Sequence, residues 1–314
     1  MTIVSQDIDK AAQLLREGKL VAFPTETVYG LGADATDDRA VTRIYVAKER
    51  PQFNPLIVHI ASIDAAKVLG VFNAAATALA NALWPGALTL VVPRTKDCPA
   101  SLLVSAGMNS IALRVPRHPV AHALLTKVQR PIAAPSANRS GRISPTAPHH
   151  VMASLGGRID MVLDGGTCGI GLESTIISCL AEPPALLRPG GIACETIEDV
   201  LEGAMATVND DGEAPVAPGQ LASHYAPRAK VRMGATSVQD GEALLAFGPK
   251  LPSHAGEMRN LSERGDLGEA AANLFAMLHE LDASGAAGIA VMPIPDTGLG
   301  LAINDRLNRA SAER

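Results

Sequence analysis

Two hydrophobic patterns alternate over the first 200 residues of the chain. Residues 8–16 carry apolar side chains at helical spacing, whereas residues 19–23 and 56–60 are short apolar runs with β-branched members, typical of buried strands. Further strands are predicted at residues 87–92, 111–115, 132–134, 161–163, 174–179 and 185–188, and further helices at 38–48, 63–69, 74–83, 120–128 and 147–155. This alternation indicates an α/β domain at residues 1–203 with one large, mixed sheet.

The pattern changes between residues 204 and 229. Turn-favouring polar residues at 209–213 are followed by three prolines, Pro215, Pro218 and Pro227, which predicts a linker. Beyond it, strands are predicted at residues 230–233, 243–247 and 288–292, and helices at 267–281 and 299–310. We therefore expect a second, smaller, Rossmann-like doubly wound α/β domain at residues 230–314.

Composition agrees with two folded domains and points to a cytoplasmic protein. The 314 residues exceed the size at which a single core usually stops growing, and 47% of them are hydrophobic. No apolar run is long enough to span a bilayer, and the charged first residues lack the apolar segment of a signal peptide. The four cysteines form no CxxC pair, so we expect reduced thiols rather than a zinc site.

Charge is distributed unevenly along the chain. Residues 1–200 hold 18 lysines and arginines against 17 aspartates and glutamates, whereas residues 201–314 hold 9 against 15. The first domain is thus the better host for an anionic ligand, although a net charge of +1 is far from the strongly basic character of most nucleic-acid-binding domains. Ordinary solvated surfaces explain the same totals, so charge alone does not define a partner.

Two polar segments follow predicted strands, where α/β folds bind ligands. Residues 23–32 read Phe-Pro-Thr-Glu-Thr-Val-Tyr-Gly-Leu-Gly, which matches neither the GxxxxGK[ST] nor the GxGxxG nucleotide fingerprint. Residues 135–141 read Pro-Ser-Ala-Asn-Arg-Ser-Gly, whose hydroxyl and amide groups offer donors and acceptors without bulk. An ordinary turn explains either segment taken alone.

A pair of cations lies where the helix at residues 38–48 is predicted to end. Lys48 and Arg50 precede Pro51, which stops the helix, so the two side chains can converge without sharing a helix face. Together they could hold a triphosphate, the arginine as a planar fork and the lysine as a point charge. The alternative is a basic helix end that balances the helix dipole. His59, inside an apolar run, is by itself more typical of a core histidine than of a ligand.

Taken together, the segments resemble one known family. Pro-Thr-Glu-Thr-Val-Tyr-Gly-Leu-Gly, Lys-Glu-Arg-Pro with Asn-Pro-Leu after it, and Ser-Ala-Asn-Arg-Ser-Gly occur in this order. With them come Trp-Pro-Gly at 84–86, Leu-Arg-Val-Pro at 113–116, Glu-Ser-Thr-Ile at 173–176 and Leu-Arg-Pro-Gly at 187–190. This set resembles the threonylcarbamoyl-AMP synthases of the YrdC-like fold. Pro-Gly at 218–219, His-Tyr-Ala-Pro at 224–227 and Gly-Leu-Gly-Leu-Ala-Ile-Asn-Asp-Arg-Leu at 298–307 resemble its long form, which adds a C-terminal Rossmann-like domain. The resemblance is weakest at 237–264.

The resemblance implies an enzyme of the nucleotidyltransferase class, an L-threonylcarbamoyladenylate synthase. L-threonine, bicarbonate or CO2, and ATP with Mg²⁺ would give threonylcarbamoyl-adenylate and pyrophosphate. A downstream threonylcarbamoyl transferase would then modify tRNA, and a weak contact with tRNA is compatible with this role. Because a carbamate oxygen can attack the α-phosphorus without a protein nucleophile, such a site needs positioning and charge neutralisation more than acid–base groups.

The motifs also carry site residues onto this chain by resemblance. The signature catalytic group comprises Lys48, Arg50, Ser136 and Asn138. L-threonine would be bound by Thr27, His59, Arg114 and Ser174, with Arg114 as a two-point partner of the carboxylate. The nucleotide would be bound by Lys48, Arg50, Asn54, Ser110, Ser136, Asn138, Ser144, Arg188 and Tyr225, the last closing over it from the linker. The segment before Tyr225, Gly-Gln-Leu-Ala-Ser at 219–223, is less basic and less aromatic than in many relatives. No residue identifies Mg²⁺ ligands, which we expect to be mostly phosphate oxygens and water.

Two other functions use the same fold. A non-catalytic module that binds double-stranded RNA or tRNA would be expected to have a more basic first domain. A carbamoyl-transferring domain of a hydrogenase-maturation enzyme would come with zinc-finger-like cysteine pairs and an acylphosphatase-like module, and the sequence contains neither. Release of pyrophosphate from ATP that requires both threonine and bicarbonate separates the synthase from either.

Overall fold

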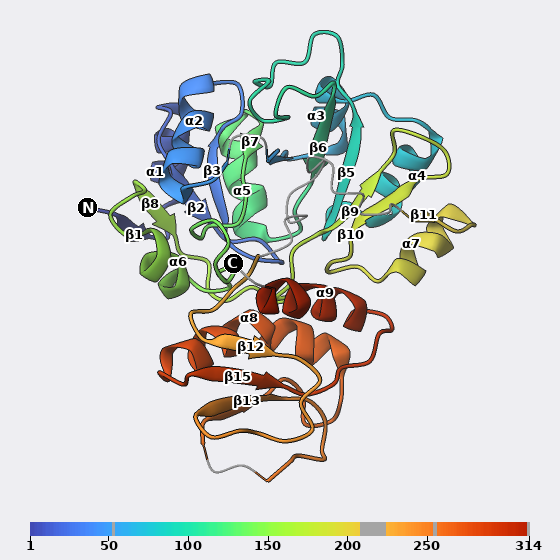
Figure 1. Cartoon of the computed structure of the whole chain (residues 1–314). Coiled ribbons are helices and arrows are strands. Elements are labelled where there is room, and N and C mark those ends of the chain that lie inside the picture. The colour runs from blue at the N-terminus through green and yellow to red at the C-terminus, as the bar shows by residue number, and fades with distance from the viewer. Residues whose placement is uncertain (52–53, 208–223, 254–255, 313–314) are drawn as a thin grey trace.

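The computed structural model describes residues 1–51, 54–207, 224–253 and 256–312, which fold into two α/β units (Figure 1). The strands of the first unit are β1 (Ile3–Ser5), β2 (Val21–Phe23), β3 (Gly30–Asp34), β4 (Ile57–His59), β5 (Leu88–Pro93), β6 (Ser110–Arg114), β7 (Ile132–Ala133), β8 (Met161–Leu163), β9 (Thr175–Ser178), β10 (Ala185–Arg188) and β11 (Ala206–Thr207). Its helices are α1 (Ile8–Arg16), α2 (Asp38–Lys48), α3 (Ile63–Leu69), α4 (Ala74–Leu83), α5 (Pro119–Val128), α6 (Pro148–Leu155) and α7 (Cys194–Leu201).

The first unit is built on one mixed sheet, as the sequence predicts. Its strand order is β1-β8-β2-β3-β7-β4-β6-β5-β9-β10-β11. Pairs such as β4–β6 and β5–β9 are parallel, whereas β2–β3, β3–β7 and β5–β6 are antiparallel. Alternating residues of one strand enter different cores, since Val21 and Phe23 pack with α1 and α5 while Ala22 packs on the opposite face with α2 and α6. Helices thus cover both faces of the sheet.

Strand β3 is the main element that the sequence pattern did not predict. Its residues, Gly-Leu-Gly-Ala-Asp, contain no β-branched side chain, and they lay in the segment interpreted as a glycine-containing loop. The strand pairs with β2, where Val21 lies opposite Gly32. A Cβ at Gly32 would lie 2.9 Å from the Phe23 ring and 3.1 Å from Ile132, so only glycine fits this close packing. Helix α7 and strands β1 and β11 were also not predicted.

The second unit is a parallel four-stranded sheet with two long helices. It comprises β12 (Lys230–Arg232), β13 (Glu242–Ala246), β14 (Met258–Asn260), α8 (Leu267–Ala283), β15 (Gly288–Val291) and α9 (Gly300–Ser311). The strand order is β12-β15-β13-β14 with every pair parallel, as expected of the predicted Rossmann-like α/β unit, although β14 was not predicted. Among the described residues the helices cover one face of this sheet rather than the two faces of a doubly wound unit. Both helices pack on the face formed by Ala243, Leu245, Ile289 and Val291, and lie between this sheet and the first unit (Figure 1).

The two units share a hydrophobic cluster. Leu172 and Ile143 of the first unit pack with Phe275 of α8, and Tyr225 joins the same cluster from the segment that precedes β12. Gly171 allows a close approach of the two backbones, since a Cβ there would lie 2.4 Å from the carbonyl oxygen of Ala271. Most of the predicted linker, residues 208–223, lies outside the described residues. The boundaries at 203/204 and 229/230 stay predictions.

No helix among the described residues is both long enough and apolar enough to cross a membrane.

Candidate active site

A pocket opens where the central strands of the large sheet end. Eight residues predicted for the site line it: Thr27, Arg50, His59, Arg114, Ser136, Ser174, Arg188 and Tyr225. They come from the loop after β2, the loop after α2, the ends of β4, β6 and β10, the segments after β7 and before β9, and the residues before β12. The free space inside amounts to about 40 Å³, room for a few water molecules but not for a nucleotide.

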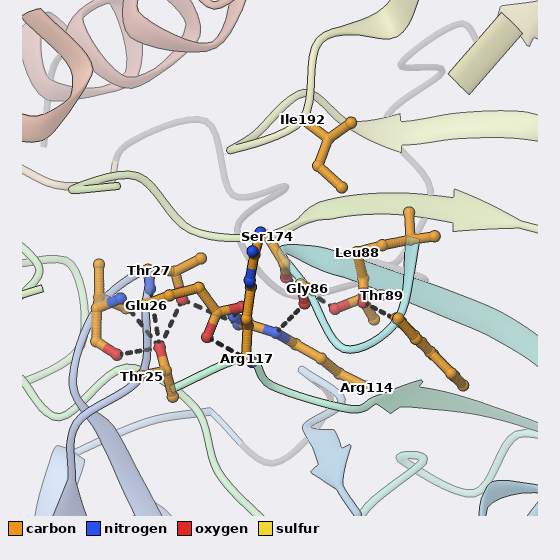
Figure 2. Close-up of polar contacts among 12 residues, drawn as sticks. Thr25, Glu26, Thr27, Gly86, Leu88, Thr89, Arg114, Arg117, Ser174 and Ile192 are labelled. Atoms are coloured by element: carbon orange, nitrogen blue, oxygen red, sulfur yellow. Dashed lines mark hydrogen bonds and ion pairs between the residues drawn. The ribbon is translucent and has the colours of Figure 1, made fainter. Parts of the chain in front are cut away.

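Arg114 lines one side of the pocket, where it contacts residues of two loops (Figure 2). Its Nε donates to the carbonyl oxygen of Gly86 at 3.2 Å, Nη1 donates to Thr27 Oγ1 at 2.9 Å, and Nη2 donates to Glu26 Oε1 at 2.6 Å. Thr27 Oγ1 in turn lies 2.7 Å from Thr25 Oγ1. The guanidinium is therefore locked in one orientation by neighbours on two loops.

Glu26 is a site residue that sequence reasoning missed. Its second oxygen, Oε2, accepts from the backbone N–H of Arg117 at 3.0 Å, so both carboxylate oxygens are used. Burial by itself would raise the pKa of Glu26, but the charge and hydrogen bond of Arg114 hold it below the usual value. In the sequence, Glu26 stands between two threonines of the Pro-Thr-Glu-Thr motif. This position alone does not reveal that the carboxylate binds an arginine of the protein rather than a ligand.

Ser174 and Arg188 meet beside Arg114. The Ser174 hydroxyl lies 2.7 Å from Thr89 Oγ1, a buried partner on β5 that the sequence analysis did not single out. Arg188 donates from Nε and Nη2 to the carbonyl oxygen of Ser174, at 3.2 and 2.8 Å. The register between β9 and β10 shifts between Leu186 and Arg188, and such bulges redirect side chains at the ends of strands.

His59 contributes an uncharged ring to the same side. The imidazole is buried, with its ring 5.9 Å from that of Phe23 in an edge-on arrangement. Burial, and then the charge of Arg114, lowers the pKa of His59 to about 3, so the ring is neutral at pH 7. Its Nδ1 has no hydrogen-bond partner among the described residues. A polar ligand in the pocket could supply one.

Lys48 ends α2 and Arg50 follows it two residues later, and the two side chains lie in different environments. Lys48 is 1% exposed and donates to the carbonyl oxygen of Ser136 at 2.5 Å and to that of Asn138. Arg50 is 8% exposed, lines the pocket, and donates to the carbonyl oxygens of Asn54 and Pro55. Within the described part of the chain, neither cation has a carboxylate partner. Burial lowers the pKa of Lys48 well below its usual value and that of Arg50 to about 10.

Unpartnered polar atoms gather on this second side. Within the described residues, both side-chain polar atoms of Asn54, together with Asn138 Oδ1 and His224 Nδ1, are buried without a hydrogen-bond partner. Asn138 also donates from Nδ2 to the carbonyl oxygens of Arg139 and Arg142, which fixes its amide. Native proteins pair almost all buried polar groups, so a cluster of unpaired donors and acceptors beside two buried cations indicates a binding site for a ligand that carries both negative charge and hydrogen-bond donors.

Ser144 reaches the pocket only through a buried carboxylate. Its hydroxyl donates to Glu173 Oε1 at 2.6 Å, and Glu173 lines the pocket. Glu173 Oε2 accepts from Nε of Arg306 at 2.8 Å, across the boundary to the second unit. Sequence reasoning quoted Glu173 and Arg306 within motifs but assigned neither a role, because they lie 133 residues apart in the chain.

Five predicted nucleotide ligands do not line the pocket: Lys48, Asn54, Ser110, Asn138 and Ser144. Ser110 begins β6 opposite Pro93, at the end of the strand away from Arg114. Tyr225 does line the pocket and is only 1% exposed, with a φ of 61° that a non-glycine residue rarely adopts. No group of three or more His, Cys, Asp or Glu side chains within the described residues could hold a metal ion.

Comparison with known proteins shows which family the chain belongs to. Residues 13–190 match the domain family described as "Telomere recombination", and residues 192–312 match the family "Threonylcarbamoyl-AMP synthase, C-terminal domain". The threonylcarbamoyl-AMP synthase of Bacillus subtilis is 43% identical over 98% of this chain and 93% of its own length. That of Pyrococcus abyssi is 41% identical over 97% of this chain and 94% of its own length.

A solved structure agrees over both units. The crystal structure of P. abyssi Sua5 complexed with L-threonine superposes with a TM-score of 0.90 at 39% identity, covering 99% of this chain and 97% of that one. The resemblance inferred from the motifs is thereby confirmed. The chain belongs to the threonylcarbamoyl-AMP synthase family, in the form that carries the additional C-terminal domain.

Proposed function

We propose that this protein is an L-threonylcarbamoyladenylate synthase, which converts L-threonine, bicarbonate or CO2, and ATP into threonylcarbamoyl-AMP and pyrophosphate. The observation that carries the proposal is the pair of buried cations, Lys48 and Arg50, beside the unpartnered amide of Asn54 and the unpartnered Oδ1 of Asn138. Such a group is costly unless a ligand supplies both negative charge and hydrogen-bond donors, and ATP carries a triphosphate together with the donors of its ribose and adenine. The relatives named as threonylcarbamoyl-AMP synthases support the same substrate class.

The first side of the pocket would bind the amino acid. Arg114 offers a fixed guanidinium for the threonine carboxylate, with Thr27 and Ser174 as hydroxyl partners. The neutral His59 ring can accept a hydrogen bond from the substrate at Nδ1. A relative solved in complex with L-threonine supports threonine as the substrate. Orientation of the amine toward the nucleotide would be the main contribution of this side.

The second side would bind the nucleotide and stabilise the leaving group. Threonine's amine and bicarbonate form a carbamate with loss of water. A carbamate oxygen then bonds to the α-phosphorus as the bond to the β-phosphate oxygen breaks, and pyrophosphate leaves with that electron pair. Arg50 would neutralise phosphate charge directly, whereas Lys48 would hold the carbonyls of Ser136 and Asn138 so that their side chains face the ligand.

Mg²⁺ would enter with ATP. Glu173 is the carboxylate that lines the pocket, and hydrogen bonds from Ser144 and Arg306 occupy its two oxygens. Phosphate oxygens and water are therefore the expected ligands, as is usual for this ion, which neutralises charge on the triphosphate when bound. Because about 40 Å³ of free space is too little for a nucleotide, we expect part of the lining to move when ATP binds, and Tyr225 is a bulky residue of the lining that belongs to the predicted linker.

The product would serve a downstream threonylcarbamoyl transferase that modifies tRNA in the cytoplasm. The test of the proposal is pyrophosphate release from ATP by the purified protein, with each substrate omitted in turn. We expect release only when L-threonine, bicarbonate and Mg²⁺ are all present. Release that ignores threonine would indicate another adenylating activity. Binding of double-stranded RNA without any release would favour the non-catalytic alternative.

A further inference from the structure

Arg306 is a charged side chain of the second unit that is buried against the first. It lies on α9 and its side chain is 0% exposed. Nη1 pairs with Asp305 on the same helix, while Nε and Nη2 both reach across the boundary between the units. A fully buried guanidinium is costly to desolvate, so its position calls for strong partners, and these partners belong to the pocket.

Arg306 contacts three segments of the chain that contribute residues to the pocket. Nε donates to Glu173 Oε2 at 2.8 Å, directly before Ser174 in the chain. Nη2 donates to the carbonyl oxygen of Pro189 at 2.9 Å, directly after Arg188. The guanidinium also lies over the ring of Tyr225, 5.2 Å from its centre. One side chain therefore links the walls that hold Ser174, Arg188 and Tyr225.

From these contacts we propose that Arg306 is a positioning residue for the reaction, through which the second domain completes the nucleotide side of the active site by holding Glu173. The inference rests on the proposed function, because it assigns Arg188 and Ser144 to the ATP site. Glu173 is the link, since its other oxygen accepts the only hydrogen of the Ser144 hydroxyl. Held in this way, the Ser144 oxygen can only accept hydrogen bonds, which suits a ribose hydroxyl or an adenine amine rather than a phosphate.

The charges around Glu173 indicate how the loss of Arg306 would affect ATP binding. Glu173 is surrounded by Arg306 and Asp305 of α9, Arg188 at the end of β10, and His224 and Tyr225 before β12. Burial by itself would raise the pKa of Glu173, but the charges of Arg306 and Arg188 and the hydrogen bonds from Ser144 and Arg306 lower it to about 2. Without Arg306, Arg188 becomes the main cation near this carboxylate. Arg188 would then be drawn to Glu173, and an ionised carboxylate would oppose the triphosphate.

The experiment compares substrate dependence in Arg306→Met, Arg306→Lys and the double variant Arg306→Met/Glu173→Gln. Arg259→Met is the matched control, since Arg259 is a partly exposed arginine of the second unit that pairs with Glu280. For Arg306→Met at pH 7.5 we expect the KM for ATP to rise at least tenfold and the KM for threonine no more than threefold. Arg306→Lys keeps a charge but loses one of the contacts, so its KM for ATP should fall in between.

The double variant and the pH profile separate positioning from a loss of folding. Removing both charges leaves no uncompensated carboxylate, so the double variant should recover a KM for ATP within about threefold of Glu173→Gln alone. In Arg306→Met the KM for ATP should improve as the pH falls from 8 to 5.5, because protonation of Glu173 removes the opposing charge. The parent enzyme should lack this improvement, since Glu173 stays ionised throughout the range.

The proposal would be overturned if both KM values change equally, the pH profile does not shift and the double variant shows no recovery. Arg306 would then be a structural residue. If Arg306→Met does not fold, Arg306→Lys and the double variant carry the same comparison. The activity of the parent protein tests the proposed function separately from the role of Arg306. An inactive parent refutes the proposed function, and the affinity for fluorescently labelled ATP still tests Arg306 by the same ranking of variants. A parent that binds no ATP refutes both.

Discussion

The two sides of the pocket are built in opposite ways. Around Arg114, each of the three guanidinium nitrogens already donates a hydrogen bond, to Gly86, Thr27 and Glu26. Around Arg50, positive charge and amide groups are buried with carbonyl oxygens as partners but no carboxylate among the described residues. The first side is thus organised before any ligand binds, whereas the second is incomplete in its hydrogen bonding.

This difference suggests how free energy is divided between folding and binding. A paired, hydrogen-bonded arginine contributes to the stability of the fold and gives a rigid receptor for a small substrate. Buried cations without a counter-charge cost stability, and this cost is recovered when a polyanion binds. We therefore expect changes on the two sides to affect stability and activity in different proportions.

The largest effect is expected for Arg50→Met. Loss of a charge-assisted contact to phosphate costs about 1.5–3 kcal/mol, which corresponds to roughly a 10- to 150-fold loss in the rate of pyrophosphate release at subsaturating ATP. The free energy of unfolding should change by less than about 1 kcal/mol, because no buried carboxylate loses its partner. Steady-state kinetics measure the loss in rate, and urea unfolding measures the change in the free energy of unfolding. A variant that is strongly destabilised would contradict the contrast drawn here.

Arg114→Lys should reduce both stability and threonine binding, in contrast to Arg50→Met, which should reduce activity alone. The three donors of an ammonium cannot replace the bonds to Gly86, Thr27 and Glu26 and also hold a substrate carboxylate at two points, so the KM for threonine should rise about tenfold or more, with the KM for ATP changing less than threefold. Stability should fall by about 1–3 kcal/mol, since Glu26 loses part of its bonding. Threonine titrations that match those of the parent would make Arg114 a purely structural residue.

A third test uses pH and His59. The pKa of this buried histidine is about 3, against 6.5 for an exposed one, so its contribution to stability is complete above pH 6.5 and is lost as the pH falls toward 3. His59→Asn should therefore lose less unfolding free energy between pH 7 and pH 4, by up to about 3 kcal/mol. The KM of the parent for threonine should show no histidine titration between pH 5.5 and 7.5. A tenfold change there, absent in His59→Asn, would show that the ring becomes charged.

The smallest effect is expected for Thr89→Val. This change keeps the shape of a buried side chain but removes the hydroxyl that lies 2.7 Å from Ser174 Oγ. We expect a loss of about 0.5–1.5 kcal/mol in the free energy of unfolding and a rise of about threefold in the KM for threonine. Thr77→Val is the control, since the Thr77 hydroxyl donates to a backbone carbonyl within α4. If both variants change the KM equally, the Ser174 contact has no role in substrate binding.

Local signals were sufficient for much of the fold. Helices α1, α2, α3 and α4 have the predicted bounds, because an apolar face at helical spacing coincides with capping side chains such as Asp7, Asp37, Ser62 and Asn73. Strand β3 was not predictable in this way, since its glycines are dictated by the Phe23 ring packed against them rather than by strand preference. Its identity depends on a tertiary contact.

For the site, the motifs indicated the segments but not the division of roles. Lys48 and Arg50 were predicted to hold one ligand together, but only Arg50 lines the pocket, and only the structure reveals that Lys48 bonds to the carbonyls of Ser136 and Asn138. Glu26 and Glu173 act on arginines that are 88 and 133 residues away in the chain. Pairing over such distances leaves no local pattern, so a single sequence could not reveal it.

The close approach at Gly171 makes the distance between the two units sensitive to a single substitution. At a φ of +75°, this residue faces the backbone of Ala271 and Ala272 on α8, where a Cβ would lie between 2.4 and 2.6 Å from their atoms. Backbone cannot rotate away as a flexible side chain can, so a single methyl group at this position would act as a wedge between the two units. Gly171→Ala would alter no charge and no hydrogen-bonding group. It would separate the effect of distance between the domains from the chemistry of the residues that connect them.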